Sequence, residues 1–186
     1  MSRIEPIDPQ KASGQAKELL DAVQSELGAT PNLIRTLAQA PSVLNGYLAL
    51  SKALSAGALS NALREQIALA IAGENNCDYC ASAHTLIGRS AGVNEDELSA
   101  NLQGESNDAR TQALLTFAKS VVAKRGFVSD RELADARTAG ISDGEIVEVV
   151  GEVARNILTN YLNHVAQTEI DFPFVSAGEA EAAAAA

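Results

Sequence analysis

Two cysteines and a histidine fall on what is predicted to be one face of a single helix. Cys77 and Cys80 form a C-x-x-C pair, and His84 follows the second cysteine by four residues. At about 100° per residue, the three positions lie within an arc of about 60° on a helical wheel. We therefore expect both thiols and the imidazole to point in one direction, with Tyr79 nearly opposite them.

A carboxylate in the preceding segment is predicted to reach the same place. The turn between the two segments is centred near Glu74 and Asn75, so an antiparallel helical hairpin sets Glu65 level with about Thr85, next to His84. Glu65 is flanked by apolar residues, where an unpaired charge is costly. We expect its carboxylate to pair with the imidazole of His84.

This set of side chains favours redox chemistry at sulfur. The thiolate is the reactive form of cysteine, and the free N–H groups and dipole at the start of a helix favour negative charge there. His84 can take the proton of Cys80, and Glu65 can orient the imidazole. Two thiols at this spacing can close to a disulfide, which protects an oxidised sulfur from over-oxidation. The predicted catalytic residues are Cys80, Cys77, His84 and Glu65.

Other interpretations of the C-x-x-C pair involve metals or cofactors. Zinc takes four ligands, whereas Cys77, Cys80 and His84 supply three, so His164 or a carboxylate would have to complete the site. A thioredoxin-like fold needs strands around the pair, and none is evident. Haem attachment needs a histidine where Ala81 stands. The pair can also be two buried apolar cysteines without chemistry. We expect the site to use no metal, flavin or haem.

His164 admits two interpretations of its own. It lies on the last predicted helix with Val153, Ile157, Tyr161 and Val165 near one face. It is either a histidine at the edge of the core, hydrogen-bonded to a neighbour, or a residue of the pocket beside the thiols.

The whole chain is predicted to be helical. Alanine is abundant, β-branched runs are few, and Gly or Pro residues separate the periodic segments. The predicted helices span 9–27, 32–40, 42–56, 61–73, 77–91, 109–125 and 130–139, with one more from a cap at Asn94 to about 102 and a last one from a cap at Ser142 to about 167. We expect residues 1–175 to form one helical domain and residues 176–186 to be a flexible low-complexity tail.

The composition and net charge of the chain argue against some classes of binding partner. The chain has 14 Lys and Arg against 24 Asp and Glu, a net charge of −10. This balance argues against nucleic acid or an anionic membrane surface as a partner. No apolar run approaches the roughly 18 residues of a membrane helix, and the N-terminal segment lacks the apolar stretch of a secretory signal. Two cysteines are too few for an extracellular disulfide framework, so we expect a cytoplasmic protein.

The segment from Leu63 to Gly92 resembles the alkylhydroperoxidase D-like branch of the carboxymuconolactone decarboxylase superfamily. Redox members of that family carry a Glu, then a C-x-x-C pair, then a His, with the spacing of Glu65, Cys77, Cys80 and His84. Two flanking stretches are similar to the family's uncharacterised peroxidase-related subgroup, T-P-N-L-I-R-T-L-A-Q-A-P-S-V-L-N-G-Y and Y-L-N-H-V-A-Q-T-E-I-D-F-P.

The resemblance implies an all-α fold, a multi-helix orthogonal bundle with the C-x-x-C pair at the start of a central helix. It implies that peroxide oxidises Cys80 to a sulfenic acid and that Cys77 resolves it. It also implies a homo-oligomer, which the leucines of 32–56 favour because a small core covers few faces; these are Leu33, Leu37, Leu44, Leu48 and Leu54. One position departs from the family pattern, since its well-studied peroxidases carry a histidine where this chain has Tyr79.

The sequence therefore favours a thiol-dependent peroxidase with an antioxidant role. Its substrate would be hydrogen peroxide or an organic hydroperoxide, and an external dithiol or a reductant protein would reset the thiols. Because a phenol is no base at neutral pH, Tyr79 predicts slow turnover. The alternative hypothesis is a non-catalytic helical oligomer whose C-x-x-C pair senses redox state or is structural. An enzyme would complete many turnovers with a dithiol, whereas a sensor would react once.

Overall fold

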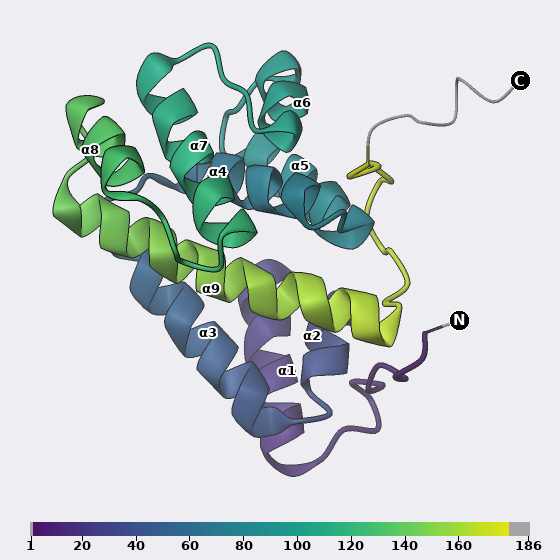
Figure 1. The fold of residues 1–186 in the computed structure, drawn as a ribbon. Helices are drawn as coiled ribbons and strands as arrows, with labels where there is room; N and C mark the ends of the chain where they lie inside the picture. The colour runs from purple at the N-terminus through teal and green to yellow at the C-terminus, as the bar shows by residue number, and fades with distance from the viewer. Residues whose placement is uncertain (1, 179–186) are drawn as a thin grey trace, which may run out of the picture.

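The computed structural model describes residues 2–178, which hold nine α-helices and no β-strand (Figure 1). The predicted all-helical class is thus confirmed. The helices are α1 (Gly14–Leu27), α2 (Asn32–Leu37), α3 (Pro41–Ser55), α4 (Asn61–Glu74), α5 (Asp78–Ser90), α6 (Glu95–Gln103), α7 (Ala109–Ala123), α8 (Asp130–Thr138) and α9 (Asp143–Ala166).

The helix starts follow the capping residues that the sequence predicts. The side chains of Ser60 and Asn94 accept N–H groups in the first turns of α4 and α6. Ser129 and Ser142 each form a reciprocal capping box with the glutamate three residues later, at the starts of α8 and α9. These caps satisfy N–H groups that have no partner within the helix.

Two helix starts differ from the prediction. Helix α1 begins at Gly14 rather than at 9, because the Asp8 carboxylate accepts the N–H of Gln10 and holds a turn there. Cys77 rather than Asn75 or Asn76 occupies the N-cap position of α5, without a side-chain capping hydrogen bond. Asn75 instead ends α4, and Asn76 has a φ of 50°, a left-handed conformation that breaks the helix. The first cysteine therefore lies at the junction of α4 and α5.

Helix α4 is the buried centre of the fold. Every residue from Ile67 to Ala72 has an exposed fraction of 0%. Gly73 allows a close approach to α6, because a Cβ atom there would lie 2.0 Å from the carbonyl oxygen of Leu102. A helix that is apolar on all sides must be covered on all sides, and α4 packs against α5, α6, α7 and α9.

Two hydrophobic clusters lie on either side of α4. One contains residues of α1 to α6 together with Cys77, Tyr79 and Cys80. The other joins α4 to α7, α8 and α9. Helix α9 crosses the molecule between α1–α3 on one side and α5–α7 on the other (Figure 1). In the described part of the chain, no helix is long and apolar enough to cross a membrane.

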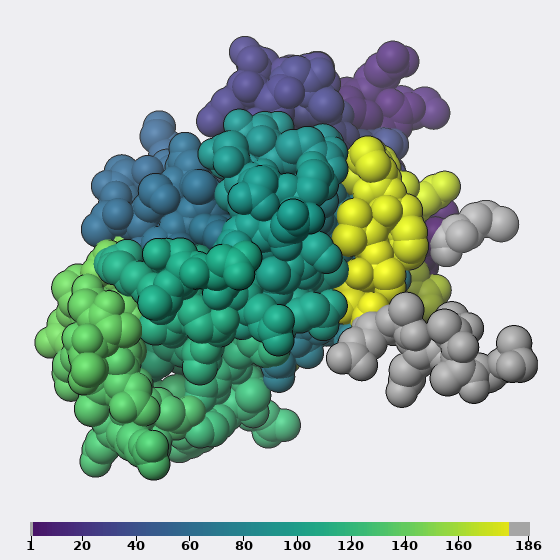
Figure 2. Space-filling view, turned by 90° about the horizontal axis from the view of Figure 1, so that it is seen from above, coloured from purple at the N-terminus to yellow at the C-terminus, as the bar shows by residue number. Residues whose placement is uncertain are grey.

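The segment after α9 returns along α5 and is held there by hydrogen bonds (Figure 2). The N–H of Val175 donates to the Ser82 hydroxyl, and the N–H of Ala177 donates to the Asp78 carboxylate. Ala177 is buried in the first cluster. Packed structure therefore extends past the predicted domain boundary at 175, and the rest of the predicted tail, 179–186, lies outside the described residues.

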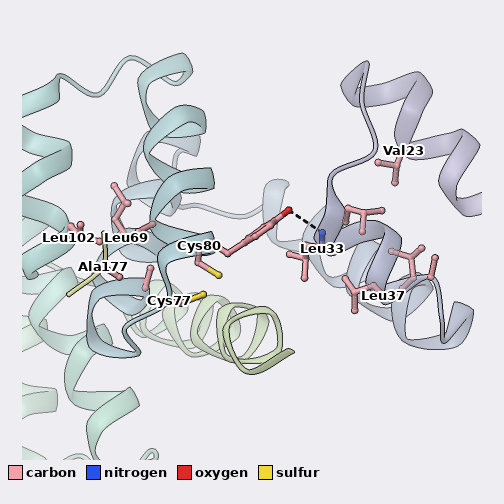
Figure 3. Close-up of a cluster of buried hydrophobic side chains, with 14 of the residues drawn as sticks. Val23, Leu33, Leu37, Leu69, Cys77, Cys80, Leu102 and Ala177 are labelled. Carbon is pink, nitrogen blue, oxygen red and sulfur yellow. Dashed lines mark hydrogen bonds between the residues drawn. The ribbon is translucent and has the colours of Figure 1, made fainter. Parts of the chain in front are cut away.

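Tyr79 joins three parts of the chain. Its hydroxyl accepts the N–H of Leu33, at the start of α2 (Figure 3), and donates to the Asp171 carboxylate. Its ring packs edge-on against Phe172, with centroids 5.5 Å apart. The hydroxyl thus bonds to α2 and to the C-terminal segment, which agrees with its predicted direction away from the thiol–histidine face.

Three of the five leucines expected to favour self-association are instead buried in the core of the protein. Leu33, Leu37 and Leu44 are buried in the first cluster. A different apolar surface is exposed on α9, where five side chains fall within an arc of about 80°: Val147, Val150, Leu158, Tyr161 and Val165. Homo-oligomerisation remains a prediction, and this face of α9 is the surface on which we expect a second copy to pack.

We expect Tyr79→Phe to lower the free energy of unfolding by about 1–3 kcal/mol, because it leaves the Leu33 N–H and a carboxylate oxygen of Asp171 without the phenol. Chemical denaturation measures this loss. Tyr161→Phe is the matched control, since the Tyr161 side chain is largely exposed. Equal stabilities of the two variants would contradict the role of the Tyr79 hydroxyl.

Candidate active site

Both cysteines lie at the start of α5 with their sulfur atoms on the side that faces α9 (Figure 3). They are free thiols, and each residue is 2% exposed. Cys80 and His84 are separated by one turn of the same helix. The predicted placement of the pair at the start of a central helix therefore agrees with the structure.

Two asparagine amides of α9 contact the sulfur of Cys80. The Nδ2 atoms of Asn160 and Asn163 lie 3.0 and 3.3 Å from Cys80 Sγ, and Asn163 Nδ2 is also 4.0 Å from Cys77 Sγ. The side chain of Asn75 donates to Asn160 Oδ1 at 2.9 Å, which orients the Asn160 amide with its N–H groups toward the thiol. Amide donors aimed at a sulfur favour its negatively charged form.

These asparagines are not among the predicted site residues, although their spacing in the sequence could have indicated them. Asn156, Asn160 and Asn163 recur at helical spacing on the buried side of α9. Buried amides need hydrogen-bond partners, so such a row on a buried face indicates a polar structure opposite it. Its identity as a thiol pair depends on the packing of α9 against α5.

The two thiols affect each other's ionisation. The Cys80 thiol lowers the pKa of Cys77, helped by the Cys80 backbone N–H and the Asn163 amide and opposed by burial. The same interaction with Cys77, together with burial, raises the pKa of Cys80 well above its ordinary value, while the amides of Asn163 and Asn160 oppose the rise. The two thiols therefore ionise as a pair rather than independently.

The predicted pairing of Glu65 with His84 is present. Glu65 Oε2 lies 2.6 Å from His84 Nδ1, and both side chains are nearly buried. Burial acts to raise the pKa of Glu65, but the charge and hydrogen bond of His84, with smaller contributions from Arg155 and Arg64, lower it below its ordinary value of 4.5. The contact predicted from the helical hairpin is therefore present.

A second buried ionic group adjoins Glu65 and was not predicted. Glu152 of α9, 0% exposed, contacts Arg64 Nε at 2.6 Å and Arg155 Nε at 2.8 Å. One carboxylate thus joins α4 to α9. His84 is hydrogen-bonded to Glu65, whereas Cys80 is hydrogen-bonded to the two asparagines. Among the described contacts there is no hydrogen bond between His84 and Cys80.

His164 combines the two interpretations that the sequence left open. Its Nε2 atom lies 2.9 Å from the carbonyl oxygen of Asn75. The residue also lines a pocket of about 360 Å³ together with Cys77, Asp78, Asn163 and Thr168. Cys80 does not line this pocket, so the two sulfurs differ in their surroundings. In the described residues, no group of three His, Cys, Asp or Glu side chains is arranged to hold a metal ion.

A helical bundle with a C-x-x-C pair on one helix and a Glu–His pair beside it is the arrangement that the resemblance to alkylhydroperoxidase D-like proteins implies. Residues 41–106, which contain all four predicted site residues, match the carboxymuconolactone decarboxylase family. The chain is also 30% identical over 93 residues to an alkyl hydroperoxide reductase of Mycobacterium tuberculosis. That match spans 50% of this chain but only 27% of the relative. The resemblance inferred from the sequence is confirmed.

Solved structures show the same fold over nearly the whole chain. An alkylhydroperoxidase AhpD core protein of Ralstonia eutropha JMP134, described as an uncharacterised peroxidase-related protein, has a TM-score of 0.81 and 24% identity, with 91% of this chain and 92% of that chain covered. The debrominase Bmp8, studied with 2,3,4-tribromopyrrole, has a TM-score of 0.76 and 20% identity, with 90% and 91% covered. These likenesses establish the fold.

Glu65→Gln tests the buried pair through the pH dependence of stability. The pKa of Glu65 is lower in the folded protein than its ordinary value of 4.5. The ionised carboxylate therefore stabilises the fold fully above that value, and this stabilisation is lost as the pH falls through the lower folded-state pKa. We expect the variant to be less stable than wild type at neutral pH, with the difference shrinking in acid. Urea unfolding across pH measures it.

The exposed Glu26 of α1 provides the control, because Glu26→Gln changes the same charge without removing a buried pair. A stability difference for Glu65→Gln that is constant from neutral to acid pH would contradict the assigned role of the ionised carboxylate.

Asn163→Leu tests whether the amides stabilise negative charge on sulfur. Losing a hydrogen bond to a charged group costs about 1.5–3 kcal/mol, which corresponds to about 1–2 pH units. We measure the rate of thiol alkylation by iodoacetamide against pH. The pH at the midpoint of this profile should rise by that amount. Asn156→Leu is the control, since Asn156 is also buried on α9 but donates to the Glu152 carbonyl. The same midpoint in both variants would exclude Asn163 from thiolate stabilisation.

Proposed function

We propose that this protein is a thiol-dependent peroxidase that reduces hydrogen peroxide or organic hydroperoxides through a dithiol–disulfide cycle at Cys77 and Cys80. The observation that carries the proposal is the pairing of the two thiols beside amide donors, where the interaction between the thiols lowers the pKa of Cys77 and raises that of Cys80. Paired thiols of this kind supply two electrons without a metal or an organic cofactor.

The first step breaks the O–O bond. As the resemblance implies, the Cys80 sulfur attacks the terminal oxygen of the hydroperoxide, forming a sulfenic acid and releasing the alcohol or water. The interaction between the thiols supports a route for the proton, since it lowers the pKa of Cys77, and a Cys77 thiolate can take the proton of Cys80 during the attack. The amides of Asn160 and Asn163 stabilise negative charge on the attacking sulfur.

The second step forms the disulfide. The Cys77 thiol attacks the sulfur of the Cys80 sulfenic acid, and water leaves. An external dithiol then returns two electrons and two protons, so that both thiols are restored. The Glu65–His84 pair stands one turn from Cys80 and supplies a base for these proton transfers. We expect the cycle to be slow, because Tyr79, which occupies the position of a family histidine, bonds to Leu33 and Asp171.

A redox sensor is the competing function, and the burial of both sulfurs favours it. Many turnovers per protein with hydrogen peroxide and dithiothreitol support the peroxidase, whereas a single stoichiometric oxidation supports the sensor. Because the fold also carries a debrominase, the assay includes 2,3,4-tribromopyrrole as an alternative substrate.

We expect Cys80→Ser to abolish peroxide turnover and Cys77→Ser to lose the disulfide while Cys80 proceeds to sulfinic acid. Mass spectrometry after stoichiometric peroxide identifies these products, and in wild type it should show the loss of two hydrogens from the peptide that holds both cysteines. Sulfenic acid formation on Cys77 at the wild-type rate in Cys80→Ser would show that the attacking sulfur has been assigned wrongly.

A further inference from the structure

The pocket beside the thiols is lined by only one of the two cysteines, although both are 2% exposed. It has a volume of about 360 Å³ and lies where the end of α9 and the segment after it meet the α4–α5 junction. Cys77 lines it and Cys80 does not. A molecule that enters from this side therefore meets Cys77 first.

The amide donors are distributed in the opposite way. Asn160 and Asn163 direct their Nδ2 atoms to Cys80 Sγ at 3.0 and 3.3 Å, whereas the shortest side-chain amide contact to Cys77 Sγ is 4.0 Å. In thiol–disulfide exchange the attacked sulfur accepts a new bond and its partner leaves as a thiolate. Once Cys77 is bonded to the reductant it is no longer a thiol that raises the pKa of Cys80, and the amide donors lower that pKa. Cys80 is then the sulfur better prepared to leave.

We propose that this pocket is the docking site of the reducing thiol, which attacks Cys77 and expels Cys80 as a thiolate into the amide groups of Asn160 and Asn163. The inference rests on the disulfide cycle of the proposed function. The thiolate of the reductant forms a mixed disulfide with Cys77 Sγ, and the Cys77–Cys80 bond breaks with its electron pair going to Cys80. A second thiol group of the reductant then attacks the reductant's own sulfur in the mixed disulfide and releases Cys77.

The pocket wall also indicates which thiols fit. Its ionisable residues include Asp78 and His164 but, among the described lining residues, no lysine or arginine. A carboxylate without a nearby cation disfavours an anionic ligand. Asn163 and Thr168 also line this wall, and each has a buried side-chain oxygen, Oδ1 and Oγ1, without a hydrogen-bond partner in the described residues. These oxygens favour a ligand that donates O–H or N–H groups. The expected reductant is thus an uncharged or cationic thiol with such a donor.

The attacked sulfur can be identified directly. The protein is oxidised to its disulfide with diamide, without peroxide, mixed with 2-mercaptoethanol, quenched with acid and analysed by fragmentation of the peptide that holds both cysteines. We expect the mercaptoethanol adduct on Cys77 and a free thiol on Cys80. An adduct mainly on Cys80, an equal distribution, or failure of diamide to form the disulfide would each overturn the proposal.

The charge preference is tested with three thiols of similar size. These are 2-mercaptoethanol, which is neutral, cysteamine, which is cationic, and 3-mercaptopropionate, which is anionic. Their rates of disulfide reduction, at equal thiolate concentrations, are divided by the rates on an unfolded peptide that carries the same disulfide. We expect the anionic thiol to be slower by about three- to tenfold in the folded protein. Equal normalised rates would overturn the assigned specificity.

Single-residue variants test which side chains produce the preference among the thiols. Asp78→Asn should restore the rate of 3-mercaptopropionate, because it removes the charge and keeps an oxygen for the Ala177 N–H. Asp96→Asn, in the first turn of α6, should leave the preference unchanged. Thr168→Val should remove any advantage of 2-mercaptoethanol over ethanethiol, which lacks the hydroxyl. An unchanged preference in Asp78→Asn would exclude Asp78 as its source.

The proposal and the proposed function can fail separately. Reduction at Cys77 with the expected preference, in a protein that does not turn over peroxide, would refute the peroxidase and leave the docking site in place. Rapid peroxide turnover with the mercaptoethanol adduct on Cys80 would support the peroxidase and refute the docking site.

Discussion

The burial of α4 on all sides is the constraint on which the rest of the structure depends. Its apolar residues from Ile67 to Ala72 have no exposed surface, so helices from both halves of the chain must pack around it. Each buried Ile or Leu side chain in this stretch contributes about 1.5–3 kcal/mol relative to an exposed one. The same packing fixes the α4–α5 junction, and Cys77 lies at this junction as the cap of α5.

The burial of α4 also determines which polar groups must be paired. Arg64 and Glu65 begin the buried part of this helix, and each is paired with a residue on another helix, Glu152 and His84 respectively. Removing one partner of a buried ion pair is strongly destabilising, whereas the intact pair adds little net stability. The physical effect of these contacts is therefore to fix how α5 and α9 lie against α4, and this arrangement brings the amides of α9 to the thiols.

The environment of the thiols is correspondingly asymmetric. Cys77 is reached from a pocket with an acidic residue in its wall, while Cys80 faces the amide donors of α9. Tyr79 lies between the two cysteines in the chain, yet its hydroxyl bonds to Leu33 and Asp171. Tyr79, next to the reactive cysteines in the sequence, thus holds α2 and the C-terminal segment in place. The side chains that contact the sulfur of Cys80 are the asparagines of α9, which are distant in the sequence.

The sequence by itself determined the local features of this protein. Helical periodicity and capping residues predicted the helices, and a hairpin of two consecutive helices sufficed to bring Glu65 to His84, because such contacts depend only on spacing along the chain. Tertiary structure alone decided the contacts of Asn160 and Asn163 with Cys80, the Arg64–Glu152 pair and the bond of Tyr79 to Asp171. These contacts join residues about 80 or more positions apart. They depend on the direction in which α9 and the segment after it cross the bundle, and the periodicity of one helix carries no information about that direction.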